Sequence, residues 1–391
     1  MKRLISSLTI FILLGGLISG LKAQSDISSI FKAGVADLNT VANGYLKPAG
    51  NSFSAGLGSN WYNTAEVHKP FGFDLTIGAG VVQAPAADQM FSLTGLTNLK
   101  PNDPTITQAP TFAGSGSGEK LDLWLNQPQY LSNGAPNPLW NNGTGKMLIT
   151  SFTTPRGISQ YIPTASAQLT IGLPFINDVT VRFVPTVEYS GFKVSMWGVG
   201  IKHNFKQWIP VLKDLPFDAA VMVAYSKFDL KYAFPTSAQI TPNMLVGTSF
   251  AYLPTSTDYS TQGMSISANA MTANIIVSKK LLFFTPYVGF GVTKTSFNLT
   301  MAGNYPLLGN PITEVKTING VDYTVPKVDG NGKPYVEITD KPDPIKIISG
   351  EVMPSTTVGF RLKILWVLAL HAQYTFQKYP TASVGFGINI R

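Results

Sequence analysis

The chain has 391 residues, of which 44% are hydrophobic and only 13% charged, with a formal net charge of +8 and no cysteine. Charged residues make up about 25% of ordinary soluble domains, so this composition is unusual for one. The absence of cysteine excludes a disulfide framework, a thiolate metal site and a lipid anchor attached through cysteine.

Residues 1–23 predict a secretory signal peptide. Lys2 and Arg3 precede an apolar segment, and Ala23 is a small residue just before the predicted cleavage at Gln24. The alternative is an uncleaved anchor helix, but glycines and serines interrupt the apolar segment. An exported chain is not expected to bind nucleic acid. Its mild basicity suits a surface that faces outer-membrane lipid and lipopolysaccharide.

Residues 24–70 predict a plug. Apolar residues from Ile27 to Leu46 recur at helical spacing, and Pro48 and Gly50 are expected to end this helix. Residues 53–70 are then expected to form an extended hinge that leads to the first strand. A short amphipathic helix here fits best against or inside a barrel lumen. The predicted plug and hinge residues are Phe31, Leu38, Tyr45, Trp61, Tyr62 and His68.

Beyond residue 70, polar and apolar side chains alternate, and no run approaches the roughly 20 apolar residues that a membrane helix needs. Residues 366–376 show the pattern clearly. One face is apolar with aromatic residues at both ends, as in a strand that faces lipid. We therefore predict an all-β fold, an antiparallel transmembrane β-barrel. The candidate strands are 71–82, 164–173, 178–188, 191–203, 217–233, 262–279, 281–300, 352–363, 365–377 and 380–391.

These ten strands are a minimum. Segments near 90–97, 119–126 and 146–154 would add two or four more, for a range of 10 to 14. The sequence does not decide which face of strand 191–203 meets the lipid, because apolar residues fall on both of its faces. Strand 217–233 changes its apolar face near Lys227, which predicts that the strand leaves the lipid there.

The connections predict the orientation. Short turns alternate with long loops near 83–163, 234–261 and 301–351. If the C-terminus lies in the periplasm, the long loops fall outside, as in outer-membrane barrels. An exception is the longer inner connection 204–216, which predicts a short interfacial helix.

The order of a helix, a "GLG" stretch and a barrel resembles the hatch-and-barrel plan of FadL-type fatty-acid transporters and of PorV-type secretion barrels. That resemblance implies 14 strands. The segments "LKPAGNSFSAGLGSNWYNTAEVHKPFGFDLTIGAG", "GLPFINDVTVRFVP" and "WGVGIKHNFKQWIPVLKDLPFDAAVMVAYSKF" more closely resemble a Bacteroidota outer-membrane barrel family with no assigned function. This match covers residues 46–80 and about 164–230 well.

Polar residues on the inferred inward faces are the candidates for lining the lumen: Arg182, Glu188, Arg361, His371 and Gln373. A serine paired with His371 would suit an outer-membrane lipase, but the sequence has no G-x-S-x-G motif. The three histidines are scattered and lack a nearby acidic cluster. We therefore expect no catalytic residue, no metal site and no cofactor.

Two functions are compatible with these features. The first is a plugged channel for small amphipathic or hydrophobic solutes. The second is a scaffold or binding barrel, an accessory of a secretion or assembly complex, that holds a partner protein at loop residues such as Tyr130, Trp140, Tyr252 and Leu253. A transporter needs a continuous lumen or a lateral gap, such as one made by a kinked strand. A scaffold needs only a filled barrel and an exposed apolar loop surface.

Overall fold

The computed structural model describes residues 31–138, 140, 145–364 and 367–390. The predicted signal peptide lies outside these residues. Within them, ten antiparallel strands pair in the order β11-β10-β9-β8-β7-β1-β20-β19-β18-β12, and β12 pairs with β11 to close the ring. The barrel strands are β1 (Phe73–Gln83), β7 (Tyr161–Leu173), β8 (Asn177–Tyr189), β9 (Phe192–Asn204), β10 (Asp218–Ala233), β11 (Gly263–Ser278), β12 (Phe284–Ala302), β18 (Val352–Ile364), β19 (Leu368–Phe376) and β20 (Thr381–Ile390).

The predicted barrel is confirmed, and each of the ten predicted strands corresponds to a strand of the ring. The 14 strands implied by the FadL-type resemblance are wrong for the described residues. Segments near 90–97, 119–126 and 146–154 do form strands, but these pair only with one another and with short neighbours outside the ring. They stay outside because their apolar side chains, such as Leu121 and Leu123, are fully buried in a separate core.

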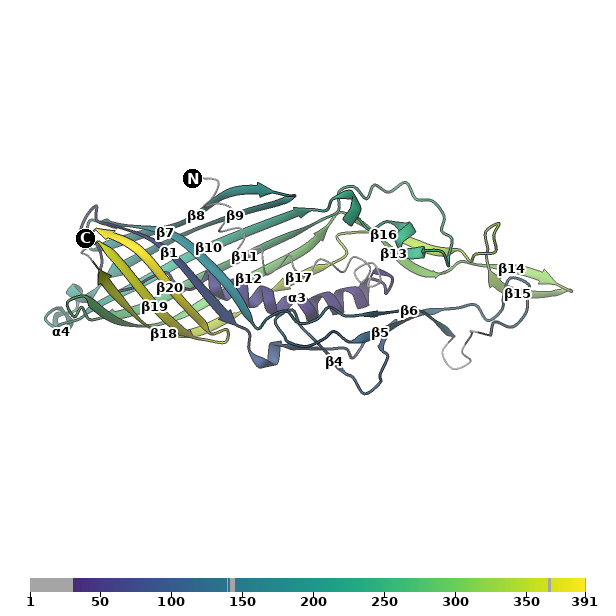
Figure 1. Ribbon diagram of the computed structural model, residues 1–391, viewed down its shortest axis with the longest axis horizontal. Coiled ribbons are helices and arrows are strands. Elements are labelled where there is room, and N and C mark those ends of the chain that lie inside the picture. Colours follow the sequence, from purple (N-terminus) through teal and green to yellow (C-terminus); the bar gives the residue numbers. More distant parts are fainter. Residues whose placement is uncertain (1–30, 139, 141–144, 365–366, 391) are drawn as a thin grey trace.

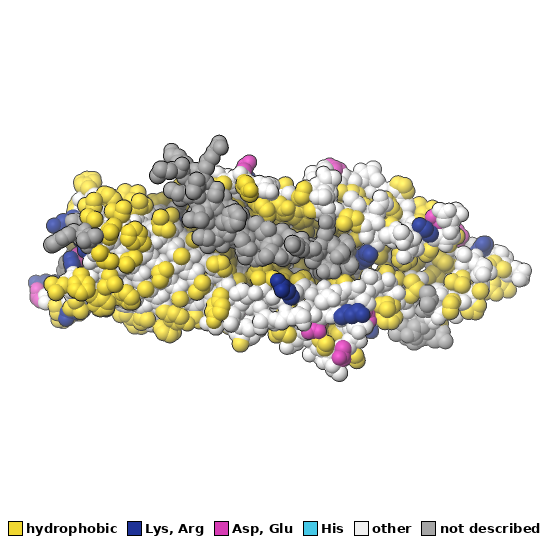
Figure 2. Space-filling view, viewed as in Figure 1, with side chains coloured by type: hydrophobic (Ala, Val, Ile, Leu, Met, Phe, Trp, Pro, Cys, Tyr) yellow, Lys and Arg dark blue, Asp and Glu magenta, His cyan; other side chains and the backbone are white. Residues whose placement is uncertain are grey.

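Alternation along each strand separates a lipid-facing side from the lumen. In β20, Val384, Phe386 and Ile388 are exposed on the lipid-facing side, whereas Ser383 and Asn389 are buried on the lumen side. Figure 2 shows hydrophobic side chains gathered over the barrel end of the molecule. Strand β9, whose orientation the sequence left open, turns Trp197 outward and buries Met196.

The long strands β10, β11 and β12 continue beyond the membrane. Crossing takes about 9–11 residues, whereas β12 has 19. On β10 the outward side chains change from Val223 and Tyr225 to Lys227 and Asp229. The strand therefore leaves the lipid near Lys227, as predicted.

A second body is built on these extensions and on the three long loops, and we call it the outer body after the side on which the sequence predicts these loops. Its core contains Phe91, Leu123, Phe250 and Val336. Its strands are β2 (Met90–Ser92), β3 (Leu99–Pro101), β4 (Gln108–Pro110), β5 (Lys120–Asn126), β6 (Lys146–Thr153), β13 (Asn304–Pro311), β14 (Thr313–Ile318), β15 (Val321–Pro326), β16 (Val336–Pro342) and β17 (Lys346–Ser349). Its short helices are η1 (Ala86–Asp88), η3 (Thr236–Ala238) and α5 (Pro242–Val246).

Helix α3 (Val35–Leu57) runs from the outer body into the barrel (Figure 1). The prediction that it ends near Pro48 is wrong, since Pro48 lies inside it. A proline removes one helical hydrogen bond, but the residues that follow are buried against the wall. A Cβ on Gly50 would overlap the ring of Phe297, and one on Gly56 would overlap the methyl group of Thr164. These glycines let the helix pack directly on the barrel strands.

The inner end of the barrel carries short turns. The connection from β9 to β10 contains η2 (Lys206–Trp208) and α4 (Pro210–Lys213), in agreement with the predicted short helix. Of the helices in the described part of the chain, none is both long and apolar enough to span a membrane.

Candidate functional site in the barrel lumen

The C-terminal end of α3 is held by Arg182, an inward residue of β8 that is fully buried. Its guanidinium donates to the carbonyl oxygens of Leu57 (3.2 Å), Ser59 (2.8 Å) and Asn60 (2.6 Å). These atoms include the free carbonyls of a helix C-terminus, where the helix dipole favours a cation. The guanidinium also lies 3.8 Å from the ring centroid of Trp61. Arg182 therefore fixes the plug to the wall.

A buried charge cluster lies nearer the inner end. The Asp178 carboxylate accepts a hydrogen bond from the backbone N–H of His68 (2.9 Å), and its other oxygen lies 3.0 Å from Lys202 Nζ. The same oxygen is 3.1 Å from Nδ1 of His68. Lys202 also donates to the carbonyl oxygens of Thr64 (3.3 Å) and Glu66 (3.0 Å). Strands β8 and β9 thus grip the segment that follows the plug helix.

A second cluster continues this network across the lumen. Arg361 Nη2 lies 3.5 Å from the Asp74 carboxylate. The side-chain amide of Asn389 donates to Asp74 at 3.1 Å and lies 2.8 Å from His68 Nε2. Side chains from five barrel strands and from the plug segment therefore form one connected floor, which we call the lumen floor.

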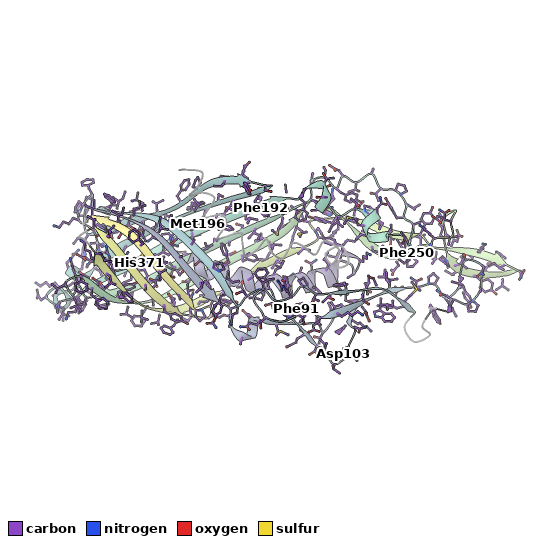
Figure 3. The ribbon with its side chains drawn as sticks, viewed as in Figure 1. Phe91, Asp103, Phe192, Met196, Phe250 and His371 are labelled. Carbon is purple, nitrogen blue, oxygen red and sulfur yellow. The ribbon has the colours of Figure 1, made fainter. Side chains whose placement is uncertain are left out.

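His371 and Gln373 lie on the same side of the lumen. His371 Nε2 is 2.8 Å from the side-chain oxygen of Asn60, and Figure 3 shows His371 among the barrel strands. The side-chain amide of Gln373 and the hydroxyl of Tyr287 form a hydrogen bond of 3.0 Å. His371 therefore holds the plug segment in place, and Gln373 ties two strands of the wall together.

The structure places four of the five predicted lumen residues inside the barrel. Glu188 is the exception and requires a correction. A β-bulge between Val184 and Val187 inserts one extra residue into β8, which reverses the side that later residues face. Glu188 is exposed and pairs with Lys193 at 2.6 Å.

The predicted plug residues lie in two places. Phe31 and Leu38 pack in the outer part of the barrel core, whereas Trp61, Tyr62 and His68 fill the inner lumen. Tyr45 lies outside the membrane-spanning strands and donates its hydroxyl to the carbonyl oxygen of Arg156 (2.9 Å). Burial raises the pKa of Tyr45 to about 12, so the hydroxyl stays protonated and remains a donor.

Sequence reasoning missed four residues of the lumen floor: Asp74, Asp178, Lys202 and Asn389. Each lies close to the inner end of a strand, on its inward face. For Asp74, Asp178 and Lys202 the signal was present in the sequence, because charged residues on the inward side of an otherwise alternating strand must find partners in the lumen.

Two cavities of about 20 Å³ each flank the plug segment, and each has room for about one water molecule. The outer one lies between Phe53 and Leu57 of α3 and the wall residues Met196 and Phe228. Arg182 and Ser383 also line it. The buried hydroxyl of Ser383 has no hydrogen-bond partner among the described residues.

The wall beside this outer cavity is incompletely paired. Strands β7 and β8 pair over six residue pairs, from Leu173–Asn177 to Gln168–Arg182. No pairing joins residues 161–167 to residues 183–189 in the described structure. Figure 1 shows the two strands diverging from their paired end. We call this unpaired part the seam.

Proline accounts for part of the seam. Pro163 of β7 and Pro185 of β8 both lie in it. Proline lacks the N–H that a sheet ladder needs, so it is confined to strand edges and bulges. On the lumen side of the seam, Thr164, Ala165 and Ser166 line the outer cavity.

A family profile described as "Family of unknown function (DUF6588)" matches residues 1–390. No curated protein matches the chain. Among solved structures, the chain is similar to Ail of Yersinia pestis, with 6% identity, a TM-score of 0.23 and coverage of 82% of this chain and 99% of that one. It is also similar to the Ralstonia pickettii toluene transporter TbuX, with 6% identity, a TM-score of 0.23 and coverage of 87% and 98%.

Proposed function

The chain belongs to the DUF6588 family, and we propose that it is an outer-membrane barrel that passes small hydrophobic or amphipathic solutes sideways through its wall. The solute would exchange between the outer interior of the barrel and the lipid layer. The observation that carries this proposal is the seam between β7 and β8, which adjoins a cavity next to the plug helix.

Passage along the barrel axis is a poorer proposal for this lumen. The lumen floor connects five strands to the plug segment through buried charges. Breaking a buried ion pair by removing one partner costs about 3–5 kcal/mol, so opening the floor would expose several costly groups together. A lateral route leaves the floor intact.

The lining of the outer cavity supports the proposed class of solute. Phe53, Leu57, Met196 and Phe228 supply apolar contacts. The unpartnered hydroxyl of Ser383, together with Arg182 and Thr164, supplies polar contacts. Such a lining suits contact with an apolar body that carries a polar end, and the cavity as it stands has room for only about one water molecule. The proposal includes no catalytic step, and the link to Bacteroidota stays a prediction from sequence.

Closing the seam with a crosslink tests the proposal. Ala165 and Pro185 lie on the two sides of the seam, and the native chain has no cysteine that would compete. We expect that Ala165→Cys/Pro185→Cys, once joined by a bis-maleimide, reduces uptake of the apolar fluorophore N-phenyl-1-naphthylamine. Uptake should fall to the level of cells that lack the protein, because the lateral route is blocked.

The matched control uses a fully paired part of the wall. Ile77 of β1 and Phe386 of β20 are direct partners, and both face outward. Crosslinking Ile77→Cys/Phe386→Cys should leave uptake unchanged. Equal loss in both crosslinked variants, or unchanged uptake in the first, would contradict the lateral route.

A second candidate function is the scaffold. The outer body has its own hydrophobic core, which is more structure than closing a barrel requires. Three of the loop residues predicted to contact a partner are at least partly covered. Tyr130 packs edge-to-face on Tyr323, Trp140 is half-buried and Tyr252 packs against the core of the outer body. Only the fourth, Leu253, is exposed. A barrel that transports no probe, with or without the crosslink, would favour the scaffold.

A further inference from the structure

Four lysines lie on the outward faces of β9, β10 and β12, in the half of each strand that is nearer the outer body. They are Lys193 of β9, Lys227 and Lys231 of β10, and Lys294 of β12. We call this surface, which spans β9 to β12, the lysine face. Lys227 is the direct partner of Trp197, and both point outward. Because aromatic belts mark the level of the lipid headgroups, the lysine face lies at and above that level.

The charges on this face are not balanced. Lys193 pairs with Glu188 at 2.6 Å, and Lys227 pairs with Asp229 at 3.3 Å. Within the described residues, neither Lys231 nor Lys294 has a carboxylate within ion-pair distance. An excess of two positive charges therefore remains on this side of the barrel.

The register places two of these ammonium groups directly opposite each other. Lys231 is directly opposite Lys193 across the β9–β10 pair, and both side chains are exposed on the outward face of the barrel wall. Like charges at directly opposed positions destabilise a sheet. Glu188 offsets the charge of Lys193, which leaves the ammonium of Lys231 to attract a further anion.

The surroundings favour an anion that is attached to sugars. Most outward positions between the lysines carry hydroxyl or amide side chains, and Met271, the direct partner of Lys294, is an apolar exception. The hydroxyl and amide residues are Ser195, Ser265, Ser267, Asn269, Ser296, Asn298 and Thr300. Side chains of this kind donate to and accept from sugar hydroxyls, whereas the lysines attract phosphate.

We propose that the lysine face binds the phosphorylated sugar headgroup of an outer-leaflet glycolipid. The acyl chains of that lipid would lie against the apolar band below Trp197 and Tyr225. The inference requires only that the barrel stands in the outer membrane with its long loops outside. It does not depend on the seam, so the two proposals can fail separately.

Binding of diphosphorylated lipid A to the full-length protein in detergent micelles tests this inference, with native mass spectrometry as the readout. Each lysine near an anionic membrane surface contributes about fivefold in affinity. We therefore expect Lys231→Gln/Lys294→Gln to bind lipid A about 25-fold more weakly. Neither lysine lies in the barrel interior, so the variant should fold normally.

The control variant is Lys213→Gln/Lys279→Gln, which removes two exposed lysines at the opposite, inner end of the barrel. It should bind lipid A as the unmodified protein does. Dephosphorylated lipid A should bind the unmodified protein as weakly as lipid A binds the double variant. Equal weakening in both variants, or equal binding of the two lipids, would overturn the inference.

Discussion

An Arg182→Met variant should lose about 3–9 kcal/mol of unfolding free energy and release the end of the plug helix. Methionine fills similar space but cannot donate, so the carbonyl oxygens of Leu57, Ser59 and Asn60 lose the bonds that Arg182 makes. Each buried acceptor left without a donor costs about 1–3 kcal/mol. Guanidinium titration of the protein in lipid vesicles measures the loss, and limited proteolysis detects the released segment.

Arg182→Lys separates charge from geometry. Lysine keeps the positive charge at the helix end but lacks the planar fork that reaches several carbonyls together. We expect its stability to lie between those of the unmodified protein and the methionine variant. If Arg182→Met is as stable and as protease-resistant as the unmodified protein, Arg182 does not hold the plug.

Asp178→Asn should be the second most damaging substitution. It removes the charge that faces Lys202 and His68, and the buried ammonium of Lys202 loses the carboxylate that lies 3.0 Å from it. Removing one partner of a buried pair costs about 3–5 kcal/mol because an uncompensated charge remains. The same guanidinium titration measures the loss of unfolding free energy.

Glu188→Gln is the matched control for Asp178→Asn. Both substitutions neutralise a carboxylate of β8 that pairs with a lysine of β9, but the Glu188 side chain is 66% exposed whereas that of Asp178 is 0% exposed. Exposed pairs contribute about 0–1 kcal/mol, so Glu188→Gln should change little. Similar losses of unfolding free energy for the two variants would show that burial does not decide how much such a pair stabilises the protein.

The wall of the barrel was predictable because lipid contact imposes a strict period of two on each strand. Residues of β20 show this alternation without interruption. The same reasoning failed for Glu188, because one extra residue at a bulge inverts the pattern beyond it. A bulge depends on pairing with the neighbouring strand, which a single strand does not reveal.

The length of α3 was not predictable from local propensity. Pro48 and the glycines around it oppose a helix, yet the helix continues to Leu57. Contacts with Phe297 and Thr164, together with the hydrogen bonds from Arg182, stabilise its second half. These contacts join residues that are far apart in the sequence, so no pattern within the helix reveals them.

The seam follows from the register between two strands, which alternation does not specify. Pro163 and Pro185 were visible in the sequence, but each could equally mark the end of a strand. Only the pairing shows that both lie in the stretch where β7 and β8 do not pair.

The most direct test of the lateral route compares two probes in the same cells. N-phenyl-1-naphthylamine reports entry of an apolar solute, and hydrolysis of nitrocefin by a periplasmic β-lactamase reports entry of a polar one. A sealed floor with an open seam predicts that the protein speeds entry of the apolar probe and leaves nitrocefin entry unchanged. If nitrocefin entry rises as well, solutes pass along the lumen axis and the lateral route is contradicted.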